Sequence, residues 1–593
     1  MLVVAVTVVG YLGFWFLCDD AFITFRYVAN AHSGHGLVWN QAPFLPVEGY
    51  SCFLWALLLW ASWEMTGLEP PVVATKLSLL CGLATLALLF DAARRVRAPS
   101  GRPLGLVAAA AVVLGCALNR TFLTFLSSGL ETAQFNLVLA WWVALLLRPA
   151  GQRSRRWLTW VSLAAALCAL SRPDGLLPVA ATVAMAGLRW RPDRRGREWL
   201  QLLPVLLVVT HLLWRRWFYG AWLPNTYYAK VVHAWPESGL RYLFCYVIEH
   251  GTWVWALMLL PWLLRALPKL SPRVMLGANL PAVIATSTLL LHAAYYTMVI
   301  GGDHFEYRVY SQLVPWLSLS TAWLASRLWQ RPRAPILAVS AMTLMGGFGF
   351  WHWQCTRHLG FYEFQPMAAK APAMLRPLLT LHDRNQAWMQ LRLVGVRSRQ
   401  LDLFCRQQMA LFPESMVLPA DAGPLPIYRV NAAGVAGYRL RDIALIDALG
   451  LNDWVIARAP APEIAPPLSP EQLAGMHGDI DRDHDGRIDY GELVAVLRLL
   501  TNPEKASYLA TLLLVLHARD EKSLTREETA QLGESLFPRH MAHERWPPPG
   551  YLEDFQPNVR IDRGRIEVTP RRTPLTPSRI AAIEREWRAR VRH

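Results

Sequence analysis

The feature that most constrains this chain is the alternation of apolar runs with short arginine-rich segments. Between Leu2 and Phe350 the apolar runs recur at lengths suited to a bilayer core of about 30 Å. We predict a polytopic α-helical membrane domain of about eleven spans. The predicted spans are 2–18, 72–92, 104–118, 133–147, 157–170, 175–189, 198–214, 251–266, 274–298, 309–326 and 335–350.

The basic residues indicate how these spans are oriented. A formal net charge of +16 can indicate nucleic-acid binding. Here, however, the arginines cluster in short segments between apolar runs, as at 94–102, 148–156 and 189–197. This distribution follows the positive-inside rule, so these segments are expected in the cytoplasm and no nucleic-acid partner is expected. The chain is therefore predicted to be a multi-pass protein of the plasma (inner) membrane with an extracytoplasmic C-terminal region.

Two apolar segments near the start differ from the other predicted spans. Leu2–Leu17 lacks a basic region before it and a small-residue cleavage site after it, so we expect a retained first span rather than a signal peptide. Phe53–Trp63 is rich in tryptophan, and counting it as a span would place the first arginine cluster outside. We predict an interfacial helix there.

Adjacent carboxylates follow the first span directly. Asp19 and Asp20 open a polar loop that also contains Arg26 and Glu48. Charged pairs at the end of a membrane span tend to face a polar cavity rather than lipid, although a hydrated helix end is the simpler alternative. The accompanying polar residues favour a site built on the first external loop.

The other predicted external loops carry ionisable residues beside turn formers. These residues are Glu131, Arg172, Lys230, Asp303 and Arg308. Each loop alone is explained as a solvated connection. Their joint placement on one side of the membrane favours a common site, although charge was itself used to assign the sides.

The first loop resembles a known family. The stretch DDAFITFRYVANAHSGHGLVWN, followed by PVEGYS, resembles the first external loop of the GT-C glycosyltransferases, in particular the mycobacterial terminal arabinofuranosyltransferases. The segments RPDG, LPNTYYAK and DALGLND are similar to segments of related proteins, and the resemblance extends to about residue 455. It implies transfer of a sugar, with a pentofuranose as one candidate, from a polyprenyl-phosphate carrier on the outer face. The expected acceptor is an envelope glycan or another hydroxyl compound.

The resemblance and the chemistry together assign candidate roles. An acceptor hydroxyl needs a carboxylate base, for which Asp19 is the candidate, with Asp20 as its orienting partner or as a metal ligand. A leaving phosphate needs cationic donors, and the candidates are Arg26, Arg172, Lys230 and Arg308. Glu48 is placed with the substrate-binding residues. Glu131 and Asp303 are candidates to complete a divalent-cation site with the aspartate pair, since hard cations prefer oxygen ligands.

Composition divides the chain into five predicted regions. They are a transmembrane glycosyltransferase-like domain at 1–350, an external α/β cap at 351–458, a proline-rich linker at 459–470, an EF-hand pair at 471–540 and a basic, mobile tail at 541–593. Cys355 and Cys405 both fall on the external side and are candidates for a disulfide in an oxidising compartment.

A calcium-binding loop is the sharpest motif in the sequence. The EF-hand ligand positions are filled by Asp481, Asp483, Asp485, Arg487 through its carbonyl, Asp489 and Glu492, and Gly486 stands at the turn. Ile488 occupies the apolar position that pairs with a neighbouring loop. The segment 517–528 lacks acidic residues at its first and third positions, so we predict a degenerate partner that does not bind calcium.

A different function class remains open at this stage. A membrane transporter or a calcium-responsive sensor would also combine apolar spans with an EF-hand. Transporters place polar or Gly/Pro-broken segments near mid-span. The predicted spans are mostly Ala, Leu and Val, with polar groups at one end, which favours the enzyme.

Overall fold

The structure is a computed structural model, and it describes most of the chain. The described residues are 1–188, 199–230, 234–266, 279–359, 365–390, 392–414, 416–419, 425–459 and 547–591, with gaps at 549, 563 and 572–574. Between 460 and 546 they are 480, 487–489, 492 and 523–525.

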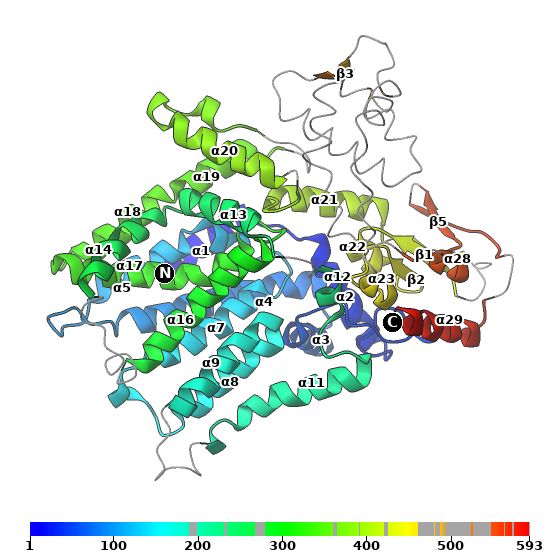
Figure 1. The fold of residues 1–593 in the computed structure, drawn as a ribbon, viewed down its shortest axis with the longest axis horizontal. Helices are drawn as coiled ribbons and strands as arrows, with labels where there is room; N and C mark the ends of the chain where they lie inside the picture. The colour runs from blue at the N-terminus through cyan, green and yellow to red at the C-terminus, as the bar shows by residue number, and fades with distance from the viewer. Residues whose placement is uncertain are drawn as a thin grey trace.

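Apolar helices form a bundle that makes up one side of the molecule (Figure 1). Its helices are α1 (Leu2–Gly13), α4 (Pro70–Ala93), α5 (Leu106–Ala117), α7 (Thr132–Leu146), α8 (Trp157–Ser171), α9 (Leu176–Leu188), α11 (Leu206–Tyr219), α13 (Pro236–Glu249), α14 (Trp253–Ala266), α16 (Leu280–Tyr295), α17 (Val314–Trp329), α18 (Ala334–Met345) and α19 (Gly347–Thr356). α4, α5, α7, α8 and α17 contribute most of one large hydrophobic core.

Among the described residues, three continuous helices are long and apolar enough to cross a membrane. They are Pro70–Ala93, Leu280–Ile300 and Ala334–Thr356. α13 and α14 together form a fourth candidate, bent by 100° at the break between them. Five further apolar helices are shorter, at 10–17 residues. The number of eleven spans stays a prediction, and the predicted boundary at 350 falls inside a helix that continues to Thr356.

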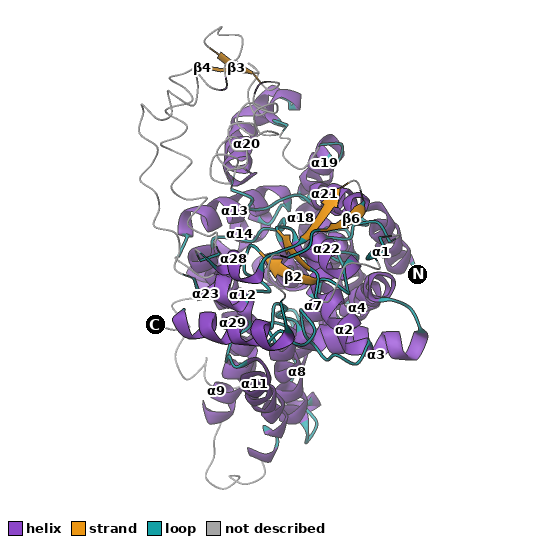
Figure 2. Cartoon of the chain, turned by 90° about the vertical axis from the view of Figure 1, so that its right-hand side faces the viewer, coloured by secondary structure: helices purple, strands orange, loops and turns teal. Residues whose placement is uncertain are grey.

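A small α/β unit within the region predicted as a cap lies beside the bundle in Figure 1 and in front of it in Figure 2. Strand β1 (Ile427–Val430) pairs in parallel with β2 (Ala444–Asp447), and α22 (Ala433–Arg439) connects them. Parallel strands need such a crossover connection. The unit also contains α21 (Ser398–Leu411) and α23 (Trp454–Arg458), whereas α20 (Arg376–Gln390) packs on α13 of the bundle (Figure 1). Cys355 and Cys405 are both free thiols and form no disulfide.

The C-terminal segment differs from the mobile tail expected from its composition. It forms α28 (Tyr551–Phe555), a hairpin of β5 (Val559–Asp562) with β6 (Arg565–Val568), and α29 (Pro577–Arg590). Thr576 caps α29 through the amide of Arg579, and Pro577 occupies its first turn.

Apolar packing holds this segment in place. The side chains of Ile580, Ile583 and Trp587 are buried against Phe44 and other residues of the first loop and cap. The Tyr551 hydroxyl also donates to Asp453 Oδ2 at 2.8 Å. Arg579, Arg585 and Arg590 lie on the exposed face of this amphipathic helix, whereas Arg588 donates to the Leu45 and Pro46 carbonyls, so the basic composition alone did not indicate this packing. Residues 460–546 therefore lie between two segments that are both anchored to the cap.

Only part of the predicted EF-hand pair lies within the described residues. β3 (Arg487–Asp489) pairs antiparallel with β4 (Ser523–Thr525), and Ile488 stands opposite Leu524. The two residues hold equivalent positions in the predicted loops 481–492 and 517–528. Asp481, Asp483 and Asp485 lie outside the described residues, so calcium binding stays a prediction.

Helix α2 (Asp19–His32) joins the bundle to the α/β unit by holding the N-terminus of α22. The carboxylate of Asp19 accepts hydrogen bonds from the amides of Gly434 at 3.1 Å and Val435 at 2.8 Å. The residue before α22, Ala432, offers no side-chain cap of its own. Asp19 therefore satisfies the open amides of α22 and complements the positive end of its dipole.

Two turns further along α2, Arg26 holds the other end of α22. A guanidinium has five N–H donors. Arg26 uses all of them: Nε on Trp39 O (2.6 Å), Nη1 on Gly437 O (2.6 Å) and Leu440 O (2.9 Å), and Nη2 on Ile443 O (3.0 Å) and Asn40 Oδ1 (3.2 Å). We call Asp19 and Arg26 the α22 clamp.

Two glycines make this close approach sterically feasible. A Cβ at Gly434 would lie 1.9 Å from the Asp19 carbonyl oxygen, and one at Gly437 would lie 2.5 Å from the Trp39 ring. Both glycines stand on the side of α22 that meets α2. The clamp therefore depends on glycine at these positions as well as on the two charged side chains.

Arg26→Gln is expected to lower the free energy of unfolding by roughly 3–5 kcal/mol, since several buried carbonyls lose their donor at about 1–3 kcal/mol each. Arg94→Gln is the control, because Arg94 pairs with Asp91 at the surface and such pairs contribute at most about 1 kcal/mol. Thermal unfolding of both variants in detergent checks this. Equal shifts in the two variants would contradict the clamp.

Candidate functional site

Asp20 and Asp19 have opposite environments, although they are neighbours in sequence. Asp19 is buried, and burial raises its pKa to about 6 while the Val435 and Gly434 amides oppose that change. Asp20 is half-buried and has no hydrogen-bond or ion-pair partner among the described residues. Asp20, rather than the predicted base Asp19, therefore has carboxylate oxygens available for a ligand.

Asp20 and Arg308 both act electrostatically on the buried side chain of Cys18, so they belong to the same part of the structure. Arg308 itself is held by a bidentate pair with Asp303, in which Nε lies 2.6 Å from Oδ2 and Nη2 lies 3.1 Å from Oδ1. Nη1 of Arg308 has no partner among the described residues. This nitrogen is therefore available to donate to a ligand.

Arg172 forms the centre of the adjoining network. Its Nε donates to Asp174 Oδ1 at 3.0 Å, Nη1 to Glu131 Oε1 at 2.8 Å and Nη2 to the Tyr296 hydroxyl at 2.8 Å. His292 Nε2 lies 2.7 Å from Asp174 Oδ2. These partners come from three helices and one turn, so Arg172 is fixed in orientation before any ligand binds.

The two arginine groups belong to one electrostatic neighbourhood. The charges of Asp303, Arg172 and Glu131 all act on Arg308, and burial lowers its pKa while Asp303 raises it above the usual value. Four predicted residues are thus brought together: Glu131, Arg172, Asp303 and Arg308. With Asp20 they form what we call the loop-one site.

The remaining predicted residues have other roles or places. Arg26 has no donor left for a phosphate, so its assignment as a phosphate-binding residue is wrong. Glu48 is buried against Arg215, with Oε2 2.6 Å from Nε, and burial raises its pKa to about 7. Glu48 is therefore a structural ion-pair partner. Lys230 is exposed at the end of α12 (Asn225–Lys230) and pairs with none of the described residues.

A divalent-cation site is not supported by the donor geometry. Among the described residues no three His, Cys, Asp or Glu side chains converge as metal ligands. Asp303 and Glu131 instead bind Arg308 and Arg172. These residues therefore do not fit the predicted active-site metal, and no step of the proposed chemistry is assigned to one.

Motif segments that are distant in sequence converge around the first loop. The Asn225 side chain donates to the carbonyls of Gly450, Leu451 and Asp453. The backbone N–H of Asn225 donates to the Glu48 carbonyl at 2.8 Å. A Cβ at Gly49 would lie 1.8 Å from Asn452 Oδ1. The segments PVEGYS, LPNTYYAK and DALGLND are therefore parts of one packed unit.

A buried ionic network outside the loop-one site was missed by the sequence analysis. Arg397 donates to Glu249 at 2.7 and 2.9 Å and to Glu306 at 3.1 Å. Arg120, at the start of α6 (Arg120–Thr124), lies 2.5 Å from Glu306, and His382 Nε2 lies 3.0 Å from Glu249. Glu306 stands in the same predicted external loop as Asp303 and Arg308. Its partners are far away in the chain, and no local pattern marks them as partners.

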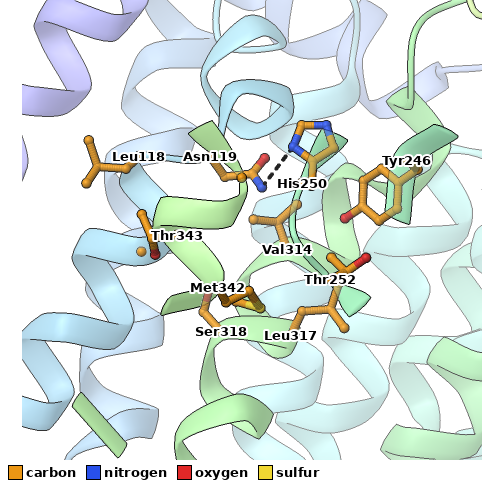
Figure 3. Close-up of a pocket in the computed structure, with 12 residues that line it drawn as sticks. Leu118, Asn119, Tyr246, His250, Thr252, Val314, Leu317, Ser318, Met342 and Thr343 are labelled. Atoms are coloured by element: carbon orange, nitrogen blue, oxygen red, sulfur yellow. Dashed lines mark hydrogen bonds between the residues drawn. The ribbon is translucent and has the colours of Figure 1, made fainter. Parts of the chain in front are cut away.

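A small cavity lies next to this network, at the break between α13 and α14 (Figure 3). Its volume is about 20 Å³, and its lining includes Asn119, His250 and Ser318. Asn119 and His250 are linked by a 3.4 Å hydrogen bond. A cavity of this volume accommodates a water molecule and no larger ligand. The cavity is therefore not a binding site for a sugar or a lipid carrier.

Glu306→Gln is expected to destabilise the protein by roughly 3–5 kcal/mol, because two buried guanidiniums lose a carboxylate. Glu586→Gln, which breaks an exposed pair with Arg590, is expected to change stability by less than about 1 kcal/mol. Denaturant unfolding in detergent compares the two variants. A Glu306→Gln protein as stable as the Glu586→Gln protein would show that the network is dispensable.

No family model matches the chain. The terminal β-(1→2)-arabinofuranosyltransferase of Mycobacterium tuberculosis is 29% identical over 265 residues, which are 42% of this chain. The match spans 41% of that relative's length, so it does not establish what the whole protein does.

Two solved structures are also similar in part. ArnT from Cupriavidus metallidurans bound to undecaprenyl phosphate has a TM-score of 0.44 and 16% identity, covering 75% of this chain and 85% of that one. ArnT in the apo state has a TM-score of 0.43 and 14% identity, covering 84% and 94%.

Proposed function

We propose that the protein is an integral membrane glycosyltransferase of the GT-C type. It moves a sugar from a polyprenyl-phosphate carrier to a hydroxyl acceptor, such as an envelope glycan, on the outer face of the membrane. The observation that carries this proposal is the loop-one site, in which an available carboxylate and two oriented arginines share one electrostatic neighbourhood. The similarity to an arabinofuranosyltransferase supports the class and favours a pentofuranose as the sugar.

In the proposed reaction Asp20 is the general base. The acceptor hydroxyl oxygen forms a bond to the anomeric carbon of the donor sugar, and its proton moves to the Asp20 carboxylate. The bond between the anomeric carbon and the phosphate oxygen breaks, and polyprenyl phosphate leaves with the electron pair. Asp19 is a positioning residue that fixes the start of α2 through the α22 clamp.

Arg308 is the proposed donor to the leaving phosphate. Its Nη1 has no partner among the described residues, while Asp303 holds the rest of the guanidinium in place. Arg172 has one partner on each of its three nitrogens and orients the neighbouring carboxylates. Because three carboxylates, Glu131, Asp174 and Asp303, pair with two arginines, the site supplies directed hydrogen bonds rather than excess positive charge.

Asp20→Asn keeps the size of the side chain but removes the proton acceptor. We expect kcat to fall by roughly 10²–10⁴-fold with thermal stability unchanged. The assay is transfer of labelled arabinofuranose from decaprenyl phosphate by the purified protein, with kcat and the unfolding temperature measured for each variant.

Asp19→Asn is the matched control, because the neutral amide still offers one oxygen to α22. We expect a lower unfolding temperature and a smaller loss of kcat than in Asp20→Asn. Near-normal turnover in Asp20→Asn together with a loss in Asp19→Asn would reverse the two assignments.

Calcium binding by the loop 481–492 is also proposed. The ligand pattern of the sequence supports it, as does the pairing of Ile488 with Leu524, which joins the two predicted loops. Residues 460–546 lie between α23 and α28, and Tyr551 binds Asp453 where these two helices meet. A module tied to the cap at both ends is suited to a structural role, in which calcium orders the module without switching on transfer.

Glu492→Gln is expected to abolish most calcium binding, because the closing bidentate ligand loses its charge. Transfer activity is expected to change less than about twofold across a titration from chelator to millimolar calcium, in the range at which extracellular modules bind. Isothermal titration calorimetry and the transfer assay check the two parts. A steep calcium-dependent rise in activity that disappears in Glu492→Gln would establish a regulatory role instead.

A further inference from the structure

A second cavity lies on the external part of the molecule, away from the loop-one site. It has a volume of about 460 Å³, which is within the usual range for ligand pockets of roughly 300–1,000 Å³. It lies where α11 ends, beside α12, α23 and the end of α29, all of which gather near the C-terminus in Figure 1. Segments from four parts of the chain therefore build it.

The chemistry of this cavity is aromatic and cationic. Its side chains include Trp222, Tyr228 and Trp454, together with Arg216 and Arg458, and no acidic residue lines it among the residues that the structure describes. Arg458 is stacked between two rings, with its guanidinium carbon 3.8 Å from the Tyr228 centroid and 4.1 Å from that of Trp454. Its Nη1 donates to Asn225 Oδ1 at 2.6 Å. The guanidinium is thus held in a fixed orientation at the cavity wall.

Trp222 supplies an exposed apolar surface, with 52% of its area accessible. Its loop leaves α11 through Gly220, whose φ of 72° is in the region that favours glycine. Arg215 Nη1 donates to Trp222 O at 3.4 Å, and Arg215 is itself paired with the buried Glu48. The first external loop therefore holds this tryptophan in position.

Helix α12 forms one wall of this cavity. Tyr228 lines the cavity, and the centroid of the Tyr227 ring lies 5.6 Å from that of the Tyr228 ring. The described lining includes none of the loop-one residues. An acceptor that contacts both places therefore has to be a chain of several linked sugars.

We propose that this cavity is a distal subsite for the acceptor glycan. The C–H face of a sugar ring packs on an aromatic surface such as that of Trp222, and sugar hydroxyls accept hydrogen bonds from fixed guanidinium donors. Because arginines and no carboxylates line the described part of the cavity, it also suits glycans that carry negative charge. This inference rests on the proposed function and adds that the enzyme recognises sugars beyond the one that receives the transfer.

Acceptors of different length provide the test. The probes are an arabinofuranose disaccharide, too short to reach the subsite, and the corresponding hexasaccharide. Trp222→Ala is expected to raise KM for the hexasaccharide about five- to tenfold, as the loss of one aromatic contact predicts, with kcat unchanged. KM for the disaccharide is expected to stay the same.

Trp217→Ala is the matched control, because Trp217 is 79% exposed on α11 and does not line the cavity. Anchoring of the tryptophans in the membrane interface is the competing explanation. It predicts equal effects of both variants and no dependence on acceptor length, and either result would overturn the subsite.

A binding measurement without donor separates this inference from the proposed function. Saturation-transfer NMR of the hexasaccharide is expected to show contact with the wild-type protein and much weaker contact with Trp222→Ala. The same signal in both proteins would overturn the subsite even if transfer occurs. If the wild type binds the hexasaccharide through Trp222 but transfers no sugar, the proposed function fails and the subsite stands.

Discussion

The pair of contacts by which α2 holds both ends of α22 is the interaction on which the α/β unit depends. Asp19 meets the open amides at one end of α22 and Arg26 meets the carbonyls at the other, so both ends of the helix dipole are complemented by charges from a single helix. Gly434 and Gly437 permit the approach. This arrangement fixes the rotation of α2. Because successive helical residues are turned by about 100°, Asp20 lies on a different face of α2 from Asp19.

The loop-one site and the α22 clamp differ in the partners of their charged side chains. In the α22 clamp, the charged groups of Asp19 and Arg26 are engaged in hydrogen bonds with backbone amides and carbonyls. In the site, Arg172 and Arg308 are paired with carboxylates that orient them, while Asp20 and Arg308 Nη1 keep unused capacity among the described residues. Such preoriented donors stabilise charge that develops during a reaction without first having to reorganise. The proposed distal subsite extends this arrangement, because Glu48 and Arg215 of the same packed unit also hold Trp222.

Part of the fold and part of the loop-one site could be predicted from the sequence. Apolar runs predicted the helices of the bundle, and loops with ionisable residues predicted that Glu131, Arg172, Asp303 and Arg308 would lie together. The different roles of Asp19 and Asp20 could not be predicted, since the two residues have the same side chain. They depend on the backbone amides of Gly434 and Val435, which bind Asp19 from 415 and 416 positions away in the chain.

Other errors have the same origin in distant contacts. Arg26 and Glu48 looked available because their partners, α22 and Arg215, are not local. The basic composition of α29 suggested mobility, yet three of its apolar residues are buried against the first loop and cap. Buried charges such as Glu249 and Arg397 carry no local signal, because each is stabilised only by a partner that folding brings to it.

The most direct test of the central claim uses the wild-type protein in sealed proteoliposomes with decaprenyl-phosphate-linked arabinofuranose in the membrane and a soluble arabinan acceptor. We predict that labelled sugar becomes covalently linked to acceptor supplied on the side that exposes the cap, and not to acceptor confined to the opposite side. Movement of the labelled lipid or sugar across the bilayer with no covalent product would contradict the account and would indicate a transporter.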